Sequence, residues 1–360
     1  MRAAFLSRRA GTYLMRLLPM TVYGRIVPRE VIGLCYHVVS DRRLPHVRHL
    51  YPYKSVEQFE ADLLYLKRRF RVVSYPEIVE AGESGRGLGP GAVHLSFDDG
   101  YAECFSVVRP ILLKHGVPCT FFVTTDALDN RWMIAFNRVS LCIETMAGLG
   151  TGELAAVLRE VERDAGTPLP DASAFGAWIR SAIRAPDSGA EEVLDRVCAR
   201  LGVDVAGFLH RERPYLTVEE VRQLASEGFT VGGHTRTHPR LGSTTGTQRI
   251  ESEIVESCRV VAEITGAERV PFAFPYDAVG VDRGFLRDLL GRHPQIGRLF
   301  GTGAFRPDED FMVNRMLVDS PPAVGRGRTN LPGLLSGAYL EEMMLLARGH
   351  RGAVEPAAAT

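Results

Sequence analysis

The chain has 360 residues, 45% of them hydrophobic and 24% charged, and its 43 basic and 43 acidic side chains leave no formal net charge. This composition supports a large packed core. It lacks the excess of positive charge, and the basic patch with interleaved aromatic residues, that favour nucleic-acid binding. The sequence has no run of about 20 apolar residues, so it predicts no transmembrane helix.

Residues 1–30 differ from the rest of the chain in their basic character. Arginines precede a short apolar run that Arg16 and Pro19 interrupt, and no small-residue cleavage site follows. We therefore expect a basic N-terminal arm rather than a signal peptide. The arm could also act as an amphipathic anchor that contacts a membrane surface through leucines such as Leu14 and Leu18.

The cysteines are scattered and form no C-x-x-C pair, which favours reduced thiols over a disulfide framework. They are Cys35, Cys104, Cys119, Cys142, Cys198 and Cys258. We therefore expect a cytoplasmic protein, which its basic arm could bring to the inner face of the membrane.

From residue 31 onward, short apolar runs alternate with helical patterns, which is typical of a parallel sheet, open or closed. A capping box at Ser55 begins the first predicted helix, and a later helix ends at Gly116. The predicted strands in this part cover residues 31–39, 71–74, 93–97 and 118–123.

Residues 126–213 break this alternation, because they contain helical patterns and no convincing strand. The helical patterns cover residues 135–146, 152–165, 173–184 and 190–201. We therefore expect a helical insertion here, and we expect it to rim the site and help to select the substrate.

A second capping box at Thr217 restarts the alternation, and a long helical pattern covers residues 247–265. Residues 321–360 hold one amphipathic pattern, at 334–346, before an end rich in Ala, Gly and Pro that we expect to be disordered. The predicted strands in this part cover residues 229–233, 271–274, 297–301 and 311–314.

Every candidate functional group lies at or just past the C-terminal end of a predicted strand. Asp98 and Asp99 end the strand at 93–97, His234 follows the strand at 229–233, and Tyr276 follows the strand at 271–274. His37 lies near the end of the first strand. Because parallel α/β folds build their sites at this edge, we expect these segments to converge.

Asp98, Asp99, His234 and His238 are residue types that suit a catalytic metal centre. One aspartate and two histidines spaced i, i+4 can hold a divalent ion such as zinc and leave a coordination position open for water. The spare carboxylate can then act as a base. This set of groups favours metal-assisted hydrolysis of an amide or ester.

Three segments resemble the motifs of the polysaccharide deacetylases with a NodB-type domain, carbohydrate esterase family four. Residues 96–101 (SFDDGY) are similar to T-F-D-D-G, residues 234–239 (HTRTHP) to H-[ST]-x-x-H-P, and residues 272–276 (FAFPY) to the third motif. The resemblance covers residues 31–125 and 214–320 and implies a distorted (β/α)7 barrel, to which residues 126–213 add the helical insertion.

The resemblance also implies a role for each motif residue. Asp98 corresponds to the general base of the family. Asp99, His234 and His238 correspond to its metal ligands, and the metal is usually zinc. The backbone N–H of Tyr276 corresponds to the group that, together with the metal, holds the oxyanion.

Two departures from the family pattern concern the groups that support the reaction. Ala273 stands where the third motif usually has an arginine that orients the catalytic carboxylate, and we expect Arg315 to supply that charge from a later strand. No L-x-H motif follows residue 276, so the general acid must come from elsewhere. His37 is one candidate, and His46 and His49 are the others.

These observations favour a metal-dependent hydrolase that removes an N-acetyl group from an amino sugar in a glycan, an oligosaccharide or a glycan precursor. The expected partner is therefore an N-acetylated sugar. Because we recognise no export signal, we expect this substrate to be intracellular. One alternative is a hydrolase of another non-peptide C–N bond, such as that of a small cyclic amide. The other is a catalytically silent barrel that binds carbohydrate.

Overall fold

The computed structural model of the chain describes residues 30–185, 189–323 and 328–347. Residues 1–29 of the predicted basic arm, with their expected membrane contact, lie outside the described residues, and so does the predicted disordered end. Among the described helices, none combines the length and the apolar character needed to cross a membrane. The predicted cytoplasmic location stays a prediction.

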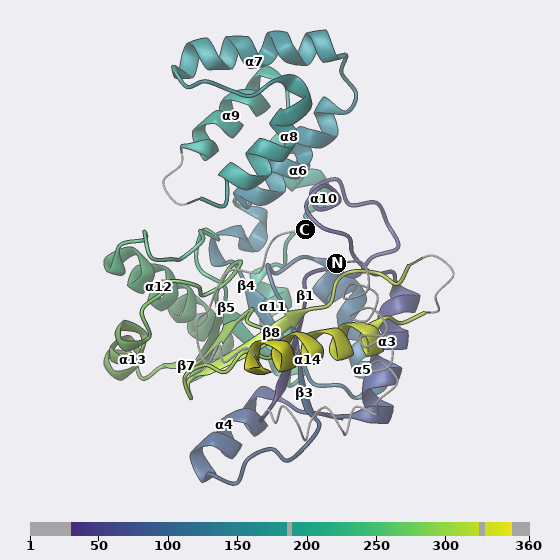
Figure 1. Cartoon of the computed structure of the whole chain (residues 1–360), viewed down its shortest axis with the longest axis vertical. Helices are drawn as coiled ribbons and strands as arrows, with labels where there is room; N and C mark the ends of the chain where they lie inside the picture. Colours follow the sequence, from purple (N-terminus) through teal and green to yellow (C-terminus); the bar gives the residue numbers. More distant parts are fainter. Residues whose placement is uncertain (1–29, 186–188, 324–327, 348–360) are drawn as a thin grey trace.

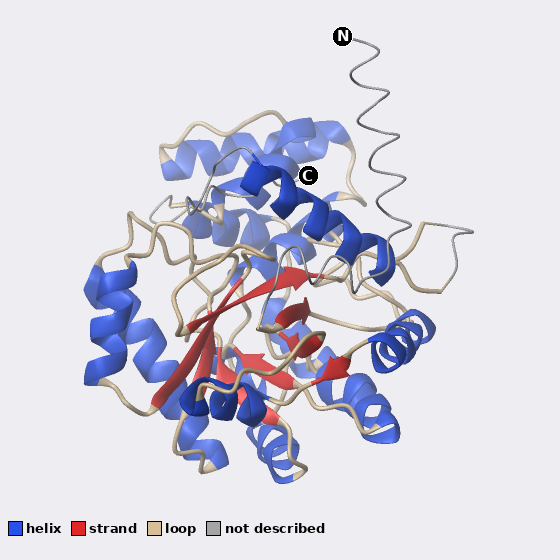
Figure 2. Ribbon diagram, turned by 60° about the horizontal axis from the view of Figure 1, so that its bottom comes forward, coloured by secondary structure: helices blue, strands red, loops and turns tan. Residues whose placement is uncertain are grey.

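Seven parallel strands close into a barrel at the centre of the fold, and helices surround them (Figure 2). Their order around the barrel is β1-β8-β7-β6-β5-β4-β3, and pairing of β3 with β1 closes the ring. The short strand β2 (Arg71–Val72) pairs with β3 beside the ring. The predicted seven-stranded α/β barrel is therefore confirmed. The strands of the ring are β1 (Ile32–Tyr36), β3 (Ala92–Phe97), β4 (Thr120–Val123), β5 (Thr230–Gly233), β6 (Val270–Ala273), β7 (Ile296–Gly301) and β8 (Met312–Leu317).

The helices outside the predicted insertion bury the apolar faces that the sequence places at helical spacing. Both predicted capping boxes, at Ser55 and Thr217, form with their reciprocal hydrogen bonds. A π-helical turn, η1 (Cys104–Val108), precedes α5, which ends at Gly116 with a left-handed φ of 61°. These helices are α3 (Val56–Arg69), α4 (Tyr75–Ser84), α5 (Arg109–His115), α11 (Val218–Ser226), α12 (Thr247–Thr265), α13 (Arg283–Arg292) and α14 (Leu331–Ala347).

Strand β3 shows how the barrel positions polar groups. Val93, Leu95 and Phe97 belong to the core between the strands and the surrounding helices. Because side chains alternate along a strand, His94 and Ser96 take the opposite face and point into the barrel. Asp98 continues this face, so the first carboxylate of the motif begins inside the barrel mouth.

Residues 126–213 form helices that stack beyond one end of the barrel (Figure 1). Helices α6 to α9 enclose an apolar core of their own, with Phe175, Ile179 and Leu194 fully buried. Phe136 of α6 packs with Tyr101 and Tyr276, which follow β3 and β6, so the helices lie over the carboxyl ends of the strands. The division into domains stays a prediction. The elements are η2 (Thr125–Asn130), α6 (Ala135–Met146), α7 (Thr151–Ala165), α8 (Ala172–Ala182), α9 (Ala190–Arg200) and α10 (Val205–Glu212).

Candidate active site

The motif segments leave their strands through turns with left-handed backbone. Asp99 has a φ of 71°, Thr235 of 64°, His238 of 58° and Tyr276 of 61°. Residues other than glycine rarely adopt this region, and backbone strain of this kind gathers at functional sites. The turns direct these side chains over the mouth of the barrel instead of along the strands.

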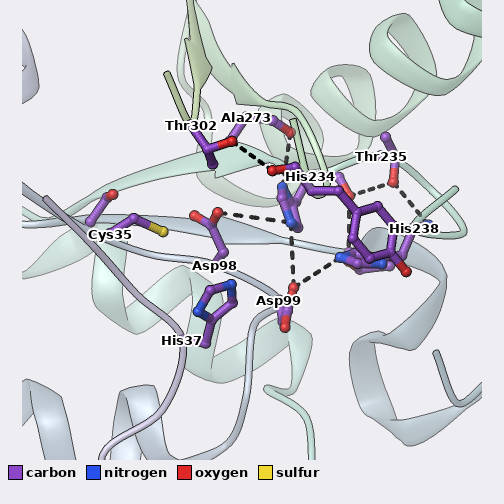
Figure 3. Close-up of polar contacts among 12 residues, drawn as sticks. Cys35, His37, Asp98, Asp99, His234, Thr235, His238, Ala273 and Thr302 are labelled. Atoms are coloured by element: carbon purple, nitrogen blue, oxygen red, sulfur yellow. Dashed lines mark hydrogen bonds and ion pairs between the residues drawn. The ribbon is translucent and has the colours of Figure 1, made fainter. Parts of the chain in front are cut away.

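Asp99, His234 and His238 converge on one point at the mouth of the barrel (Figure 3). Asp99 Oδ1 lies 3.3 Å from His234 Nε2 and 3.1 Å from His238 Nε2. The two imidazole rings are 5.0 Å apart between centroids. All three side chains are buried, so the Asp99 carboxylate and any ion bound here interact with little screening by solvent.

The hydrogen bonds around these three residues fit a bound cation. His234 Nδ1 donates to the carbonyl oxygen of Ala273 at 2.8 Å, because a carbonyl can only accept. In the neutral imidazole, the form that binds metals, Nε2 then carries the lone pair, and it faces Asp99 Oδ1, which has no donor among the described residues. Metal-binding histidines show this arrangement, and a cation held between Nε2 and Oδ1 would be bound by a lone pair from each.

Glu253 of α12 holds the loop that carries both histidines. Its carboxylate accepts hydrogen bonds from the backbone N–H of Arg236 at 2.7 Å and from the hydroxyl of Thr237 at 2.9 Å. The backbone N–H of His238 donates to Thr235 Oγ1 at 2.9 Å. These bonds set the spacing between the two histidines. The i, i+4 pair is therefore carried by a loop and not by one turn of a helix.

Arg315 of β8 makes a two-pronged contact with Asp98. Its two terminal nitrogens lie 2.6 and 2.9 Å from the two carboxylate oxygens, and Nη1 also donates to Ser96 Oγ at 3.0 Å. Arg315 is fully buried, and its guanidinium group stacks over the rings of Phe122 and Phe300 at 5.1 and 5.7 Å. The contact expected between Arg315 and Asp98 is therefore present, and its catalytic role is a proposal.

The environment of Asp98 favours its ionised form. Burial alone would raise the pKa of this carboxyl, but the charge and hydrogen bonds of Arg315, together with the nearby His234 and His37, lower it. Gly33 of β1 makes room for the arginine, since a Cβ at this position would lie 2.7 Å from Arg315 Cγ. A glycine on β1 is therefore needed to make room for the arginine of the neighbouring strand β8.

His37 lies beside Asp98 and forms a pair with Asp319, which follows β8. Its Nδ1 is 2.7 Å from Asp319 Oδ2, and its backbone N–H donates to Asp319 Oδ1 at 2.8 Å. A ring nitrogen of His37 lies within 4.8 Å of an Asp98 oxygen. Burial lowers the pKa of His37, but the Asp319 carboxylate, with smaller contributions from Asp99 and Asp98, raises it to about 9. His37 is therefore protonated at neutral pH and can donate a proton.

The two other candidate acids do not share this position. His46 is buried against Tyr101 and Phe208, and burial lowers its pKa to about 4, so it is neutral near pH 7. His49 pairs through Nε2 with Glu144 of α6 at 2.7 Å. The structure thus brings His37, and neither of these two, into contact range of Asp98.

Tyr276 lies where β6 opens into the site, next to the second histidine. Its ring contacts His238 at 5.1 Å and Phe136 of α6 at 5.8 Å between centroids. Its carbonyl oxygen accepts a hydrogen bond from Thr302 Oγ1 at 2.6 Å. These contacts fix the peptide whose N–H is the expected oxyanion donor, and that role stays a proposal.

A cavity of about 840 Å³ lies between the barrel mouth and the helices of residues 126–213. His238 and Tyr276 form part of its wall on the barrel side, and Arg184 and Glu191 form part of the opposite wall. Pockets of this size accommodate small ligands. The helical segment therefore contributes side chains to the space next to the candidate metal centre.

Sequence reasoning missed two side chains that the structure places at the site. Asp319 pairs with His37, and Tyr51 lies 3.3 Å from the second oxygen of Asp99 through its hydroxyl. Asp319 could have been recognised as a carboxylate just past the last strand if the end of that strand had been predicted correctly. No local signal marks Tyr51, because it lies in a loop between β1 and α3.

Comparison with protein families gives one match, to the family described as polysaccharide deacetylase, over residues 85–149 and 185–287. These segments include all three motifs. The chain belongs to the polysaccharide deacetylase family, of the NodB type. Comparison with the curated proteins gives no match.

Comparison with solved structures gives several similar chains. IcaB from Ammonifex degensii is 17% identical, with 86% of this chain and 96% of that chain covered and a TM-score of 0.51. The deacetylase PplD of Streptococcus pyogenes, in complex with acetate, is 14% identical, with coverages of 80% and 92% and a TM-score of 0.48. A de-N-acetylase from Aggregatibacter actinomycetemcomitans is 18% identical, with coverages of 80% and 95% and a TM-score of 0.47. The similarity to IcaB shows a common fold.

Replacement of His238 by alanine is expected to remove metal and activity together. Because changing even a hydrogen-bond partner of a ligand typically costs about 10- to 100-fold in affinity, loss of a ligand should cost more than about 100-fold. Zinc content after dialysis measures the effect. His115→Ala, which breaks a surface pair with Glu60, is the control. Full metal occupancy in His238→Ala would remove His238 from the site.

Proposed function

We propose that the protein is a metal-dependent hydrolase that removes the N-acetyl group from an amino sugar in a glycan, an oligosaccharide or a glycan precursor. Asp99, His234 and His238 converge on one point, and this convergence is the observation that carries the proposal. Beside them lies a separate carboxylate, Asp98, which is paired with Arg315. Membership of the polysaccharide deacetylase family supports an acetylated sugar as the substrate class.

We propose zinc as the ion, because three protein ligands of the nitrogen and oxygen type with an open position are typical of catalytic zinc sites. A divalent ion held by Asp99, His234 and His238 would polarise the acetyl carbonyl and make water more acidic. The buried position of all three ligands keeps competing solvent away from this centre.

The remaining groups divide the proton transfers between them. Asp98 accepts the proton of the attacking water, since its low pKa keeps it ionised and Arg315 fixes its orientation. His37, held protonated by Asp319, donates a proton to the nitrogen of the leaving amine. The backbone N–H of Tyr276 stabilises the negative charge that develops on the carbonyl oxygen.

Replacement of Asp319 by asparagine is expected to move the alkaline limb of the activity profile to lower pH. Activity needs protonated His37, so it falls as the pH rises through the pKa of this residue, about 9 with the carboxylate present. Without that charge, the pKa should drop toward or below its usual value of about 6.5, a shift of more than about one unit. The pH dependence of kcat/KM measures it.

The control for this variant is Asp308→Asn, which disrupts a similarly buried carboxylate, paired with Arg283 outside the site. Its alkaline limb should match that of the wild-type protein. An unchanged limb in Asp319→Asn would exclude His37 as the general acid.

The function is tested by product analysis with zinc-loaded protein. N-acetylated chitooligosaccharides and a nucleotide- or lipid-linked N-acetylhexosamine are offered in parallel with a small cyclic amide, and released acetate and free amine are measured. Equal amounts of acetate and sugar amine, abolished by a chelator, are the expected result. Hydrolysis of the cyclic amide alone would favour another C–N hydrolase. Carbohydrate binding with no hydrolysis would favour a silent barrel.

A further inference from the structure

A row of hydroxyl and amide groups leads from the carboxylate of Asp99 into helix α6. The hydroxyl of Tyr51 lies 3.3 Å from Asp99 Oδ2 and 3.1 Å from the hydroxyl of Tyr101. Asn137 Nδ2 is 2.8 Å from the Tyr101 hydroxyl, and the Tyr215 hydroxyl is 2.6 Å from Asn137 Oδ1. Tyr101, Asn137 and Tyr215 are at most 1% exposed. The row therefore runs through the protein interior.

The direction of these hydrogen bonds is set at the far end of the row. The backbone N–H of Ile134 can only donate, and it donates to the Tyr215 oxygen at 3.1 Å. The Tyr215 proton is then given to Asn137 Oδ1. The backbone carbonyl of His46 can only accept, and Asn137 Nδ2 donates to it at 2.8 Å, which fixes the orientation of the amide. The second amide hydrogen is left for Tyr101.

The same direction continues to the candidate metal centre. The ionised Asp99 carboxylate can only accept, so the Tyr51 proton is given to Asp99 Oδ2 at 3.3 Å. The Tyr101 hydroxyl accepts from Asn137, and its proton then bridges the 3.1 Å to the Tyr51 oxygen. Hydrogen bonds aligned in this way polarise one another in a buried environment.

The row gives the two oxygens of Asp99 different environments. Oδ2 receives the hydrogen bond from Tyr51, whereas Oδ1 faces the Nε2 atoms of His234 and His238 and has no donor within the described part of the chain. The carboxylate is thus held in the orientation that presents one oxygen to the histidines. Partners that orient a ligand in this way commonly change metal affinity when they are replaced.

We propose that Tyr101 and Asn137 are positioning residues of the metal centre, which orient Asp99 through Tyr51 and make ion affinity depend on helix α6. This inference rests on the proposed metal site. It links four segments that are distant in sequence: the loop after β1, the turn after β3, α6 and the residues before α11. The helical segment then supports the ion as well as lining the neighbouring cavity.

Replacement of Tyr101 by phenylalanine tests the row with the smallest change. The substitution removes one hydroxyl and keeps the ring, which stacks on Tyr215 at 5.9 Å between centroids. Zinc affinity, measured by competition with a chelating dye, should fall about 10- to 100-fold. Asn137→Leu should give a similar loss, and the double variant should lose little more, because both changes break the same row.

Tyr53→Phe is the matched control, because the Tyr53 hydroxyl donates to the Arg42 carbonyl at 2.9 Å in the same loop but outside the row. Its zinc affinity should equal that of the wild-type protein. If Asn137→Leu fails to fold, Tyr101→Phe decides the question alone. Wild-type zinc affinity in Tyr101→Phe would overturn the inference and leave the metal site intact. A wild-type protein that binds no zinc would contradict the metal site itself, and the inference with it.

Discussion

Replacement of Asp98 by asparagine is expected to leave zinc bound and to reduce acetate release by about 100- to 10,000-fold. The loss follows because an amide cannot accept the proton of the attacking water. Zinc should remain because Asp98 is not one of the three converging ligands, and Arg315 contacts both of its oxygens. Metal content and released acetate, measured on the same sample, give both quantities.

Asp99→Ala is the matched comparison for this variant, since it removes the adjacent carboxylate of the same turn. It should lose the metal as well as the activity, because Asp99 Oδ1 is the oxygen that faces both histidines. If Asp98→Asn lost zinc to the same extent as Asp99→Ala, the roles assigned to the two carboxylates would have to be exchanged or merged.

Replacement of Arg315 by alanine is expected to lower both stability and activity. It leaves the Asp98 carboxylate buried without its cation, and breaking a buried pair in this way typically costs about 3 to 5 kcal/mol in the free energy of unfolding. The pKa of Asp98 should then rise, so that the base is protonated over more of the neutral range. Denaturant unfolding and the acid limb of the activity profile measure the two effects.

The stability effect has a predictable pH dependence. In the wild-type protein the folded-state pKa of Asp98 is low, so the pair stabilises the fold above the unfolded-state pKa of about 4, and this stabilisation is lost as the pH falls through the folded-state pKa. The difference in the free energy of unfolding between the wild-type protein and Arg315→Ala should therefore become smaller in acid.

Arg315→Lys keeps the charge without the paired contact and should recover part of the stability. An Arg315→Ala variant with wild-type rate, stability and pH profile would exclude the proposed role.

The metal-binding set could be predicted because its residues sit at strand ends within short motifs. Asp99, His234 and His238 need only the closure of a parallel barrel to meet. Ala273 stands where the third motif of the family usually has an arginine, so Asp98 lacks the usual cation. The contact of Arg315 with Asp98 could be expected for this reason.

Asp319 could not be predicted because the last strand was expected to end at residue 314. Polar Asn314 and Arg315 resemble the end of a strand, but β8 continues to Leu317. The buried charge of Arg315 is tolerated inside the strand because it pairs with the Asp98 carboxylate. The rings of Phe122 and Phe300 cover the guanidinium group. The strand end therefore falls two residues before Asp319, and the predicted boundary was wrong.

The row from Asp99 to α6 also lies beyond sequence reasoning. Its central contacts join residues 36 and 78 positions apart, from Tyr101 to Asn137 and from Asn137 to Tyr215. Such contacts depend on how the helical segment packs on the barrel, which no periodicity encodes. The short helices α4, α10 and α13 were also missed from the sequence, although Ser74, Asp204 and Asp282 cap their N-termini.

Reconstitution of the metal-free protein tests the central claim most directly. The ion is removed with a chelator, zinc is returned in steps, and acetate released from an N-acetylated oligosaccharide is measured at each step. We expect no acetate without zinc, a linear rise, and a plateau at one equivalent, with no rise in Asp98→Asn at the same zinc occupancy. Acetate release that is independent of zinc, or none at full occupancy with any N-acetylated sugar, would contradict the central claim.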